Sequence, residues 1–210
     1  MYQFQERNLA GSHNTWIWKA KLPLKIKVFL WQLFRDAVLT TENLKKRNCP
    51  GNPVCSFCDQ VETATHLFFG CNHAKVVWGT LGAVWGTSSC PNYLWQCMVW
   101  LNMFFPLGKK FHMLLFALAC WAIWNIRNKI TFDGMVVRSP IVTIGSMCAY
   151  LHYWAGLYGE EDGDRIRRGA GELMQKVSQL VARAGGHDVA AARQGQGGQV
   201  VLAITDGSQP

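Results

Sequence analysis

The chain has 210 residues, of which 50% are hydrophobic and 16% are charged, and its formal net charge is +8. This composition excludes a disordered polyelectrolyte, and eight cysteines are too few for a disulfide scaffold of this length. The opening residues lack the apolar core of a signal peptide, so we expect an intracellular protein of a reducing compartment, nuclear or cytoplasmic.

Residues 1–15 are interpreted as an N-terminal tail, and a mainly α fold begins after them. Pro23 suits the first turn of a helix. Apolar residues then recur at helical spacing and predict one buried stripe, made of Leu24, Val28, Trp31, Phe34 and Val38. This helix should therefore contribute that stripe to the core.

A second, short helix is predicted to start at Thr40 or Thr41, either of which can cap it. Glu42 falls in its first turn, where a negative charge favours the helix dipole. Its C-terminal end is basic, with Lys45, Lys46 and Arg47. The turn-forming residues CPGNPV then end the helix.

The segment CSFCDQVETATHLFFGC has the donor types and the spacing of a zinc site. Cys55 and Cys58 form a Cys-x-x-Cys turn, and His66 and Cys71 complete a set of four ligands. Four protein ligands leave no coordination position open for a water molecule. The sequence therefore predicts one structural Zn²⁺ rather than a catalytic metal.

Other interpretations of this segment remain open. A Cys-x-x-Cys pair can be a redox motif, although no βαβ pattern surrounds this one. Cys49 or His73 could also replace one of the four ligands. We favour His66 over His73, because Cys71 and His73 are two positions apart at the start of a helix and would point to different faces.

Helical segments are predicted to follow the cysteine turn. Residues 62–69 should form a short helix that presents His66. Another helix should run from Cys71 or Asn72 to Trp85, and its apolar residues are Val76, Val77, Leu81, Val84 and Trp85. Residues 93–105 and 111–126 are strongly apolar, but both runs are shorter than the roughly 18 residues needed to span a membrane. We therefore expect packed helices and no membrane association.

The last apolar segment covers residues 139–158, and the folded part is expected to stop near residue 158. One amphipathic helix is predicted over residues 171–183, followed by the flexible linker GGHDVAAARQGQGGQ. The predicted organisation is a tail (1–15), a small helical zinc-binding module (16–87), a region of apolar packed helices (93–158) and a flexible C-terminal tail (159–210).

The stretch from Trp16 to Trp78 resembles the reverse-transcriptase zinc-binding domain of plant LINE-type non-LTR retrotransposons and derived proteins. The matching features are Trp18 with Pro23, the segment KIKVFLW, Thr40-Thr41 before LKKR, the CSFC turn, HLFF before Cys71, and Trp78. Further on, Trp124-Asn125, Arg127-Asn128-Lys129 and Phe132 are similar to a WxxRNxxxF segment that usually follows this domain. The resemblance implies a retroelement origin.

No Tyr-x-Asp-Asp polymerase motif occurs in the chain, and 210 residues could not also hold a polymerase, so we expect a fragment or a domesticated remnant. The terminal VVLAITDGSQP resembles the opening strand of a ribonuclease H domain, in which Asp206 would be the counterpart of a magnesium ligand. A two-metal site needs several carboxylates, and an ordinary Asp-Gly turn is an equal alternative. We expect no enzymatic activity.

Charge gives the remaining indication of function. Residues 1–80 hold ten basic and five acidic side chains, and residues 81–210 hold eleven and eight. The basic excess near the zinc module predicts sequence-independent contact with RNA or DNA phosphates, for which the candidates are Lys25, Lys27, Lys45, Lys46 and Arg47. A merely solvated surface is the alternative. In a second hypothesis the chain is a protein-interaction or scaffold remnant that docks through the region from Trp95 to Trp124.

Overall fold

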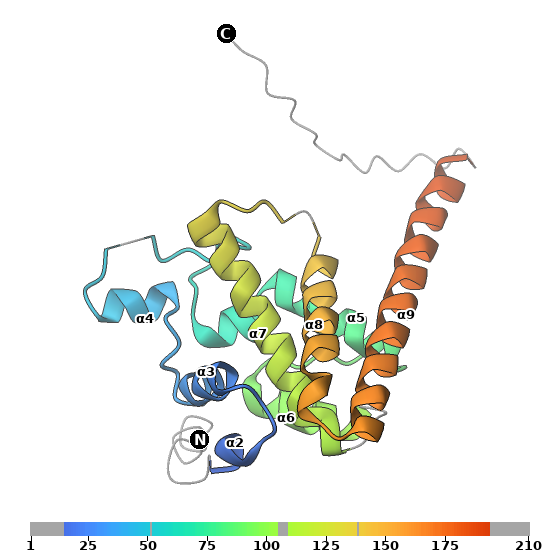
Figure 1. Ribbon diagram of the computed structural model, residues 1–210. Helices are drawn as coiled ribbons and strands as arrows, with labels where there is room; N and C mark the ends of the chain where they lie inside the picture. Colours follow the sequence, from blue (N-terminus) through green and yellow to red (C-terminus); the bar gives the residue numbers. More distant parts are fainter. Residues whose placement is uncertain (1–14, 51, 105–108, 138, 194–210) are drawn as a thin grey trace. The chain divides into compact units, whose positions relative to one another are not determined.

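The computed structural model describes residues 15–50, 52–104, 109–137 and 139–193. These segments are mainly helical, as predicted, and their one β-bridge pairs Val54 with Val61 (Figure 1). The helices are α2 (Thr15–Lys19), α3 (Leu24–Phe34), α4 (Thr41–Lys46), the π-turn η1 (His66–Gly70), α5 (Asn72–Val84), α6 (Leu94–Phe104), α7 (Lys109–Asp133), α8 (Ile141–Trp154), the 3₁₀ turn η2 (Ala155–Leu157) and α9 (Glu160–Arg193).

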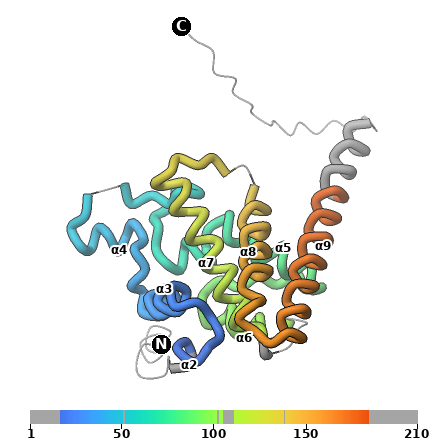
Figure 2. Tube along the Cα trace, in the orientation of Figure 1, coloured from blue at the N-terminus to red at the C-terminus, as the bar shows by residue number. Residues whose placement is uncertain are grey.

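The long helix α7 is the centre of the core. It packs against α8, α6, α3 and η1 (Figures 1 and 2). Its residues Leu114–Ile123 are buried almost without interruption, because neighbours cover it on several sides. Within the described residues, no helix is long and apolar enough to cross a membrane.

The predicted buried stripe of α3 is wrong. Leu24 is 70% exposed, Val28 is 38% exposed, and Trp31 and Phe34 are only partly buried. The face that enters the core instead carries Ile26, Phe29, Leu30 and Leu33. Both faces of the sequence KIKVFLWQLF are apolar, so its periodicity alone could not show which one meets α7. Val38 is buried, but it lies beyond the end of the helix.

The chain divides into two compact units, Met1–Val177 and Ser178–Pro210, and the hydrophobic core belongs to the first. The expected end of the folded part near residue 158 is therefore wrong. The side chains of α9 that enter the core are Ile166, Ala170, Leu173 and Val177. They repeat every three or four residues, and the predicted helix 171–183 captured only the second half of that stripe. The expected linker is helical as far as Arg193.

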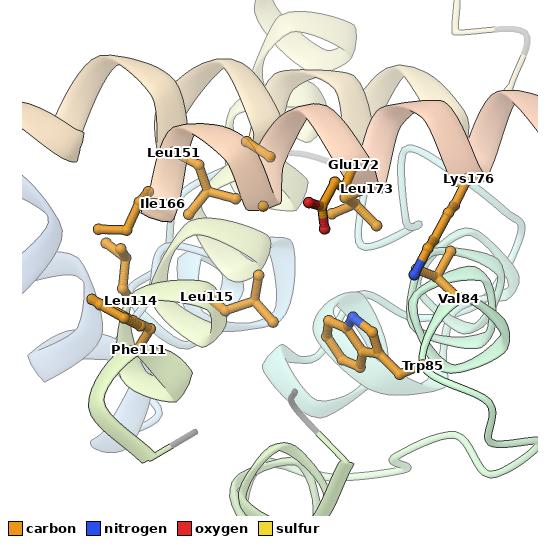
Figure 3. Close-up of a pocket in the computed structure, with 12 residues that line it drawn as sticks. Val84, Trp85, Phe111, Leu114, Leu115, Leu151, Ile166, Glu172, Leu173 and Lys176 are labelled. Atoms are coloured by element: carbon orange, nitrogen blue, oxygen red, sulfur yellow. The ribbon is translucent and has the colours of Figure 1, made fainter. Parts of the chain in front are cut away.

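A cavity of about 200 Å³ lies where the first part of α9 meets α5, α7 and α8 (Figure 3). Its lining is apolar except for Glu172 and Lys176 of α9. The small residues Gly169 and Ala170 form part of its α9 wall. Packing of α9 on the core is therefore incomplete at this point.

Residues between the cysteine turn and η1 contribute a buried ion pair. Glu62 lies before the helical turn rather than inside it, and its carboxylate is fully buried. The Arg127 guanidinium of α7 donates to both Glu62 oxygens, with N–O distances of 2.6–3.1 Å. The Thr41 backbone N–H, at the start of α4, donates to the same carboxylate at 3.0 Å. One buried charge pair thus connects the cysteine turn, α4 and α7.

The exposed and buried faces of α3 predict opposite effects of two similar truncations. Ile26→Ala removes fully buried methyl groups and should lower the free energy of unfolding by about 2–5 kcal/mol. Leu24→Ala should change it by no more than about 0.5 kcal/mol, because this side chain is mostly in water. Urea unfolding followed by circular dichroism measures both values, and equal effects would contradict the assignment of the two faces.

Neutralising Glu62 should be strongly destabilising. Glu62→Gln leaves the Arg127 charge buried without its counterion, and we expect a loss of about 3–5 kcal/mol in the free energy of unfolding. The matched control is Asp164→Asn, which breaks the exposed pair with Arg167 and should cost less than about 1 kcal/mol. Similar losses in the two variants would show that burial of the Glu62 pair has no special effect.

Candidate metal centre

The four cysteine and histidine side chains of the predicted zinc site come from three short backbone features. Cys55 and Cys58 lie in the turn closed by the Val54–Val61 bridge, and the Cys58 N–H donates to the Cys55 carbonyl at 3.2 Å. His66 begins the π-turn, where the Thr63 hydroxyl accepts a hydrogen bond from its backbone N–H at 2.9 Å. Cys71 is the N-cap residue of α5. Each feature is local, and only their packing brings the donors together.

Contacts with the hydrophobic core hold the π-turn η1 in place. Leu67, Phe68 and Phe69 are buried, and the Trp78 indole N–H of α5 donates to the Phe68 carbonyl at 2.8 Å. A π-turn widens the helix and disturbs its regular hydrogen bonds, so such a partner for a buried carbonyl is needed. The tryptophan that ends the matching stretch of sequence therefore holds the backbone next to His66.

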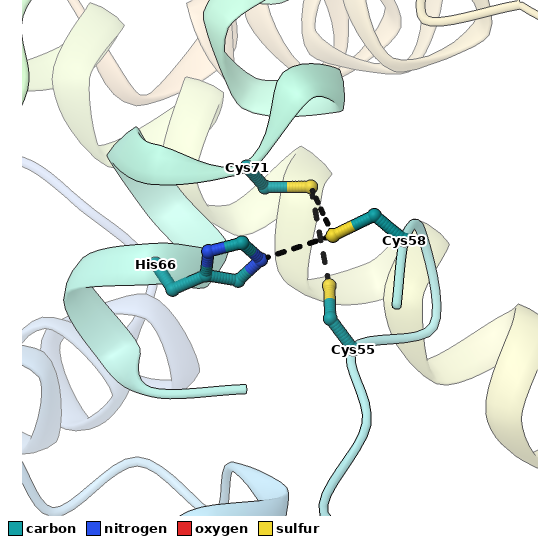
Figure 4. A group of neighbouring side chains, drawn as sticks. All are labelled: Cys55, Cys58, His66 and Cys71. Atoms are coloured by element: carbon teal, nitrogen blue, oxygen red, sulfur yellow. Dashed lines mark hydrogen bonds between the residues drawn. The ribbon is translucent and has the colours of Figure 1, made fainter. Parts of the chain in front are cut away.

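The four donor atoms converge on one point (Figure 4). All lie within 4.8 Å of one another. Cys55 Sγ is 3.9 Å from Cys71 Sγ, and Cys71 Sγ is 3.7 Å from Cys58 Sγ. Cys58 Sγ is 3.2 Å from His66 Nε2. Two of the residues are buried and two are half-buried, so the site lies at the edge of the core.

These distances fit a tetrahedral zinc ion. With Zn–S bonds of about 2.3 Å, two sulfurs of a tetrahedral shell lie about 3.8 Å apart. The two measured S–S distances, 3.9 and 3.7 Å, fall on either side of that value. Three sulfurs and one imidazole nitrogen are also a donor set that zinc prefers in structural sites. The residues present therefore fit this metal.

The pKa values of two cysteines in the cluster move in opposite directions. The hydrogen bond to Cys71, together with burial, raises the pKa of the Cys55 thiol, whereas the same contact lowers the pKa of Cys71. Neighbouring thiols thus compete for protons, since two thiolates this close repel each other. Burial lowers the pKa of His66, which favours the neutral imidazole that binds metal.

The two alternative ligands lie elsewhere. The His73 ring nitrogen Nε2 lies 2.8 Å from the Thr143 hydroxyl of α8, and the ring stacks on Phe57 with centroids 3.9 Å apart. Burial lowers the pKa of His73 to about 4, so it is a neutral core residue. Cys49 is exposed beyond α4. The structure brings together His66 with the three cysteines and leaves both alternatives out of the cluster.

The five candidate phosphate-binding residues fall into two groups. Lys25 and Lys27 lie on α3, and the other three close α4, with Lys45 and Lys46 in its last turn and Arg47 as the C-cap. Lys46 pairs with Glu42 at 3.0 Å. Lys25 Nζ lies 5.8 Å from the Trp121 ring centroid and 5.5 Å from that of Trp154, while Lys27 Nζ donates to the Trp18 carbonyl at 2.8 Å.

Sequence reasoning missed the role of Glu62 and Arg127 beside the metal centre. The Glu62 backbone N–H donates to the Pro53 carbonyl, and its own carbonyl accepts from the Glu42 N–H, so it lies on the second arm of the cysteine turn. Its pairing with Arg127 fixes this arm to α7. The arginine of the WxxRN segment was the one available signal, but nothing in the sequence indicated its partner 65 positions away.

Comparison with known proteins agrees with the geometry. Residues 1–78 match a family model described as zinc-binding in reverse transcriptase. A stretch of 72 residues is 32% identical to the Arabidopsis thaliana protein named "Putative ribonuclease H protein At1g65750". The match covers 34% of this chain and 12% of that relative. No solved structure matches the chain.

A helical unit with a Cys₃His cluster at the edge of its core belongs to the class of small zinc-binding domains. Within that class, residues 1–78 match the zinc-binding domain of reverse transcriptases. The described structure adds that the core of this domain continues into α7, well beyond the matched residues.

Metal analysis of purified protein tests the ligand set. We expect one zinc per chain by mass spectrometry, and we expect Cys58→Ser and His66→Ala to lose it, because each removes a donor from the cluster. The controls are His73→Gln and Cys49→Ser, which should keep the metal. Zinc retained in His66→Ala but lost in His73→Gln would show that the wrong histidine has been assigned.

Proposed function

We propose that this chain is a non-catalytic zinc-binding module of retroelement descent, in which Cys55, Cys58, His66 and Cys71 hold one structural Zn²⁺ and basic residues bind RNA or DNA phosphates. The convergence of four protein donors within 4.8 Å of one another supports a structural rather than a catalytic role for the metal. When bound, the zinc supplies structural cross-linking, since four ligands fill a tetrahedral shell. The eight free cysteines fit a reducing compartment, the nucleus or the cytoplasm.

Hydrogen bonds connect the neighbourhood of the metal centre to α4, whose C-terminal end is basic. The N-terminal end of α4 is held by the Glu62 carboxylate, and the Thr41 hydroxyl donates to the Pro53 carbonyl at 2.9 Å. Zinc would fix the cysteine turn, which these two partners flank directly, and α4 is only six residues long. The metal therefore positions Lys45, Lys46 and Arg47, all exposed, for contact with a polyanion.

A second function is favoured by an observation on α6. Trp95, Val99 and Met103 are spaced by four residues on one face of this helix and are 55%, 37% and 68% exposed. Such an apolar stripe is typical of a protein-contact surface. In this alternative, zinc only maintains the fold, and α6 docks on a protein partner.

Charge reversal on α4 tests nucleic-acid binding. We expect the triple variant Lys45→Glu, Lys46→Glu, Arg47→Glu to bind a fluorescein-labelled RNA about ten-fold or more weakly, with a shallower dependence on salt, because phosphate contacts release counterions. Fluorescence anisotropy at several salt concentrations measures both effects. The matched control reverses three exposed basic residues outside α3 and α4, namely Lys129, Arg168 and Lys176.

Equal weakening by the control would mean that only net charge matters, and this would contradict a defined surface on α4. Binding that neither variant affects, together with self-association that Val99→Asp abolishes, would favour the protein-interaction function. Zinc content and the circular dichroism spectrum of each variant confirm that it is folded.

A further inference from the structure

The outer face of α3 combines large apolar side chains with positive charge. Leu24, Val28, Trp31 and Arg35 recur at intervals of three or four residues and so share one side of the helix. That side is opposite the fully buried face of α3, although Trp31 is only partly exposed and also packs against the core. Trp18 of the neighbouring α2 is 46% exposed. We name Trp18, Leu24, Lys27, Val28, Trp31 and Arg35 the α3 stripe.

A hydrogen bond and a cation–π contact join aromatic and basic groups along this stripe. Lys27 Nζ donates to the Trp18 carbonyl at 2.8 Å, which joins α2 to α3 and places a cation beside Trp18. One turn further on, the Arg35 guanidinium carbon lies 4.6 Å from the Trp31 ring centroid. This distance is within the range of a cation–π contact. The stripe therefore combines the exposed Trp18 ring, the Lys27 cation and the Trp31–Arg35 contact.

The charge within residues 15–35, which contain the stripe, has one sign, and the first acidic residue after them is Asp36. From Thr15 to Arg35 the chain has five basic residues and no acidic one. Two further lysines lie near aromatic rings of other segments. The Lys21 cation lies over the Tyr158 ring, and the Lys25 cation lies over the rings of Trp121 and Trp154. Such a surface is complementary to a polyanion.

The aromatic rings of the stripe and the arginine beside Trp31 favour single-stranded over double-stranded nucleic acid as the polyanion. Duplex DNA or RNA presents phosphates but hides the faces of its bases, so a duplex cannot use these rings. A single strand presents both, and its bases stack on aromatic side chains and on arginine planes whatever their sequence. The exposed apolar area of the α3 stripe, which costs free energy in water, would be covered by such bases.

We propose that the α3 stripe is a binding surface for single-stranded nucleic acid, with bases stacked on Trp18 and on the Trp31–Arg35 pair and phosphates held by Lys27. The proposal rests on the proposed function in requiring that the chain bind nucleic acid at all. It adds the form of the ligand and a surface separate from the basic end of α4.

The experiment compares three tryptophan variants of the full chain: Trp18→Ala, Trp18→Phe and Trp95→Ala. The control residue Trp95 is similarly exposed, but its helix α6 carries no charged side chain. The probes are a fluorescein-labelled oligothymidylate of about 20 nucleotides, a duplex of the same length, and vesicles of phosphatidylcholine with anionic phosphatidylglycerol.

We expect Trp18→Ala to bind the single strand about ten-fold more weakly, since loss of one stacked base has an effect of that order. Its salt dependence should be unchanged, because no cation is removed. Trp18→Phe should restore most of the affinity, and Trp95→Ala should bind like the wild type. Duplex affinity should be the same in all four proteins.

Unchanged single-strand affinity in Trp18→Ala, or an equal loss in Trp95→Ala, would overturn the proposal. So would preferential binding to the anionic vesicles, because this would assign the stripe to a lipid surface. If the wild type binds nucleic acid through α4 while Trp18→Ala has no effect, only the α3 stripe fails. If the wild type binds neither single strand nor duplex, the proposed function fails as well.

Discussion

Three sulfurs and one imidazole nitrogen held within 4.8 Å of one another are the constraint on which the N-terminal half of this protein depends. Without a cation, closely spaced thiols must share protons, as the opposite pKa shifts of Cys55 and Cys71 indicate. A divalent ion removes this conflict and connects the cysteine turn, the π-turn and the start of α5. Each segment is ordered by local backbone hydrogen bonds, and a shared metal would link the three to one another.

A buried ion pair extends this order into the helical core. Glu62 follows the cysteine turn, and Arg127 lies near the end of the central helix α7. Their pairing, and the bond from Thr41 to the same carboxylate, make α4, the metal centre and α7 interdependent. Burying two charges is costly unless every hydrogen-bonding position is used, and no buried side-chain polar atom in the described residues lacks a partner. A boundary between a zinc module and a separate helical region therefore has little structural meaning here.

Both candidate binding surfaces are parts of helices that the packing of the core leaves exposed. Helix α3 is apolar on two faces, and the core covers only one of them, so the other remains exposed beside lysines. Helix α4 is held at its N-terminal end and presents its basic end to solvent. In both cases, the contacts that stabilise the fold also decide which charged and aromatic groups are available to a ligand.

The sequence by itself determined the chemistry of the metal centre and the positions of most helices. Donor types and spacing limited the ligands to a few residues, and Thr40 indicated the cap of α4 because capping is a local interaction. Only the tertiary structure decided which face of α3 is buried, that α9 completes the core, and that Glu62 meets Arg127. Each of these depends on contacts between residues far apart in the chain. Periodicity describes one helix at a time, so it cannot identify the neighbour that covers it.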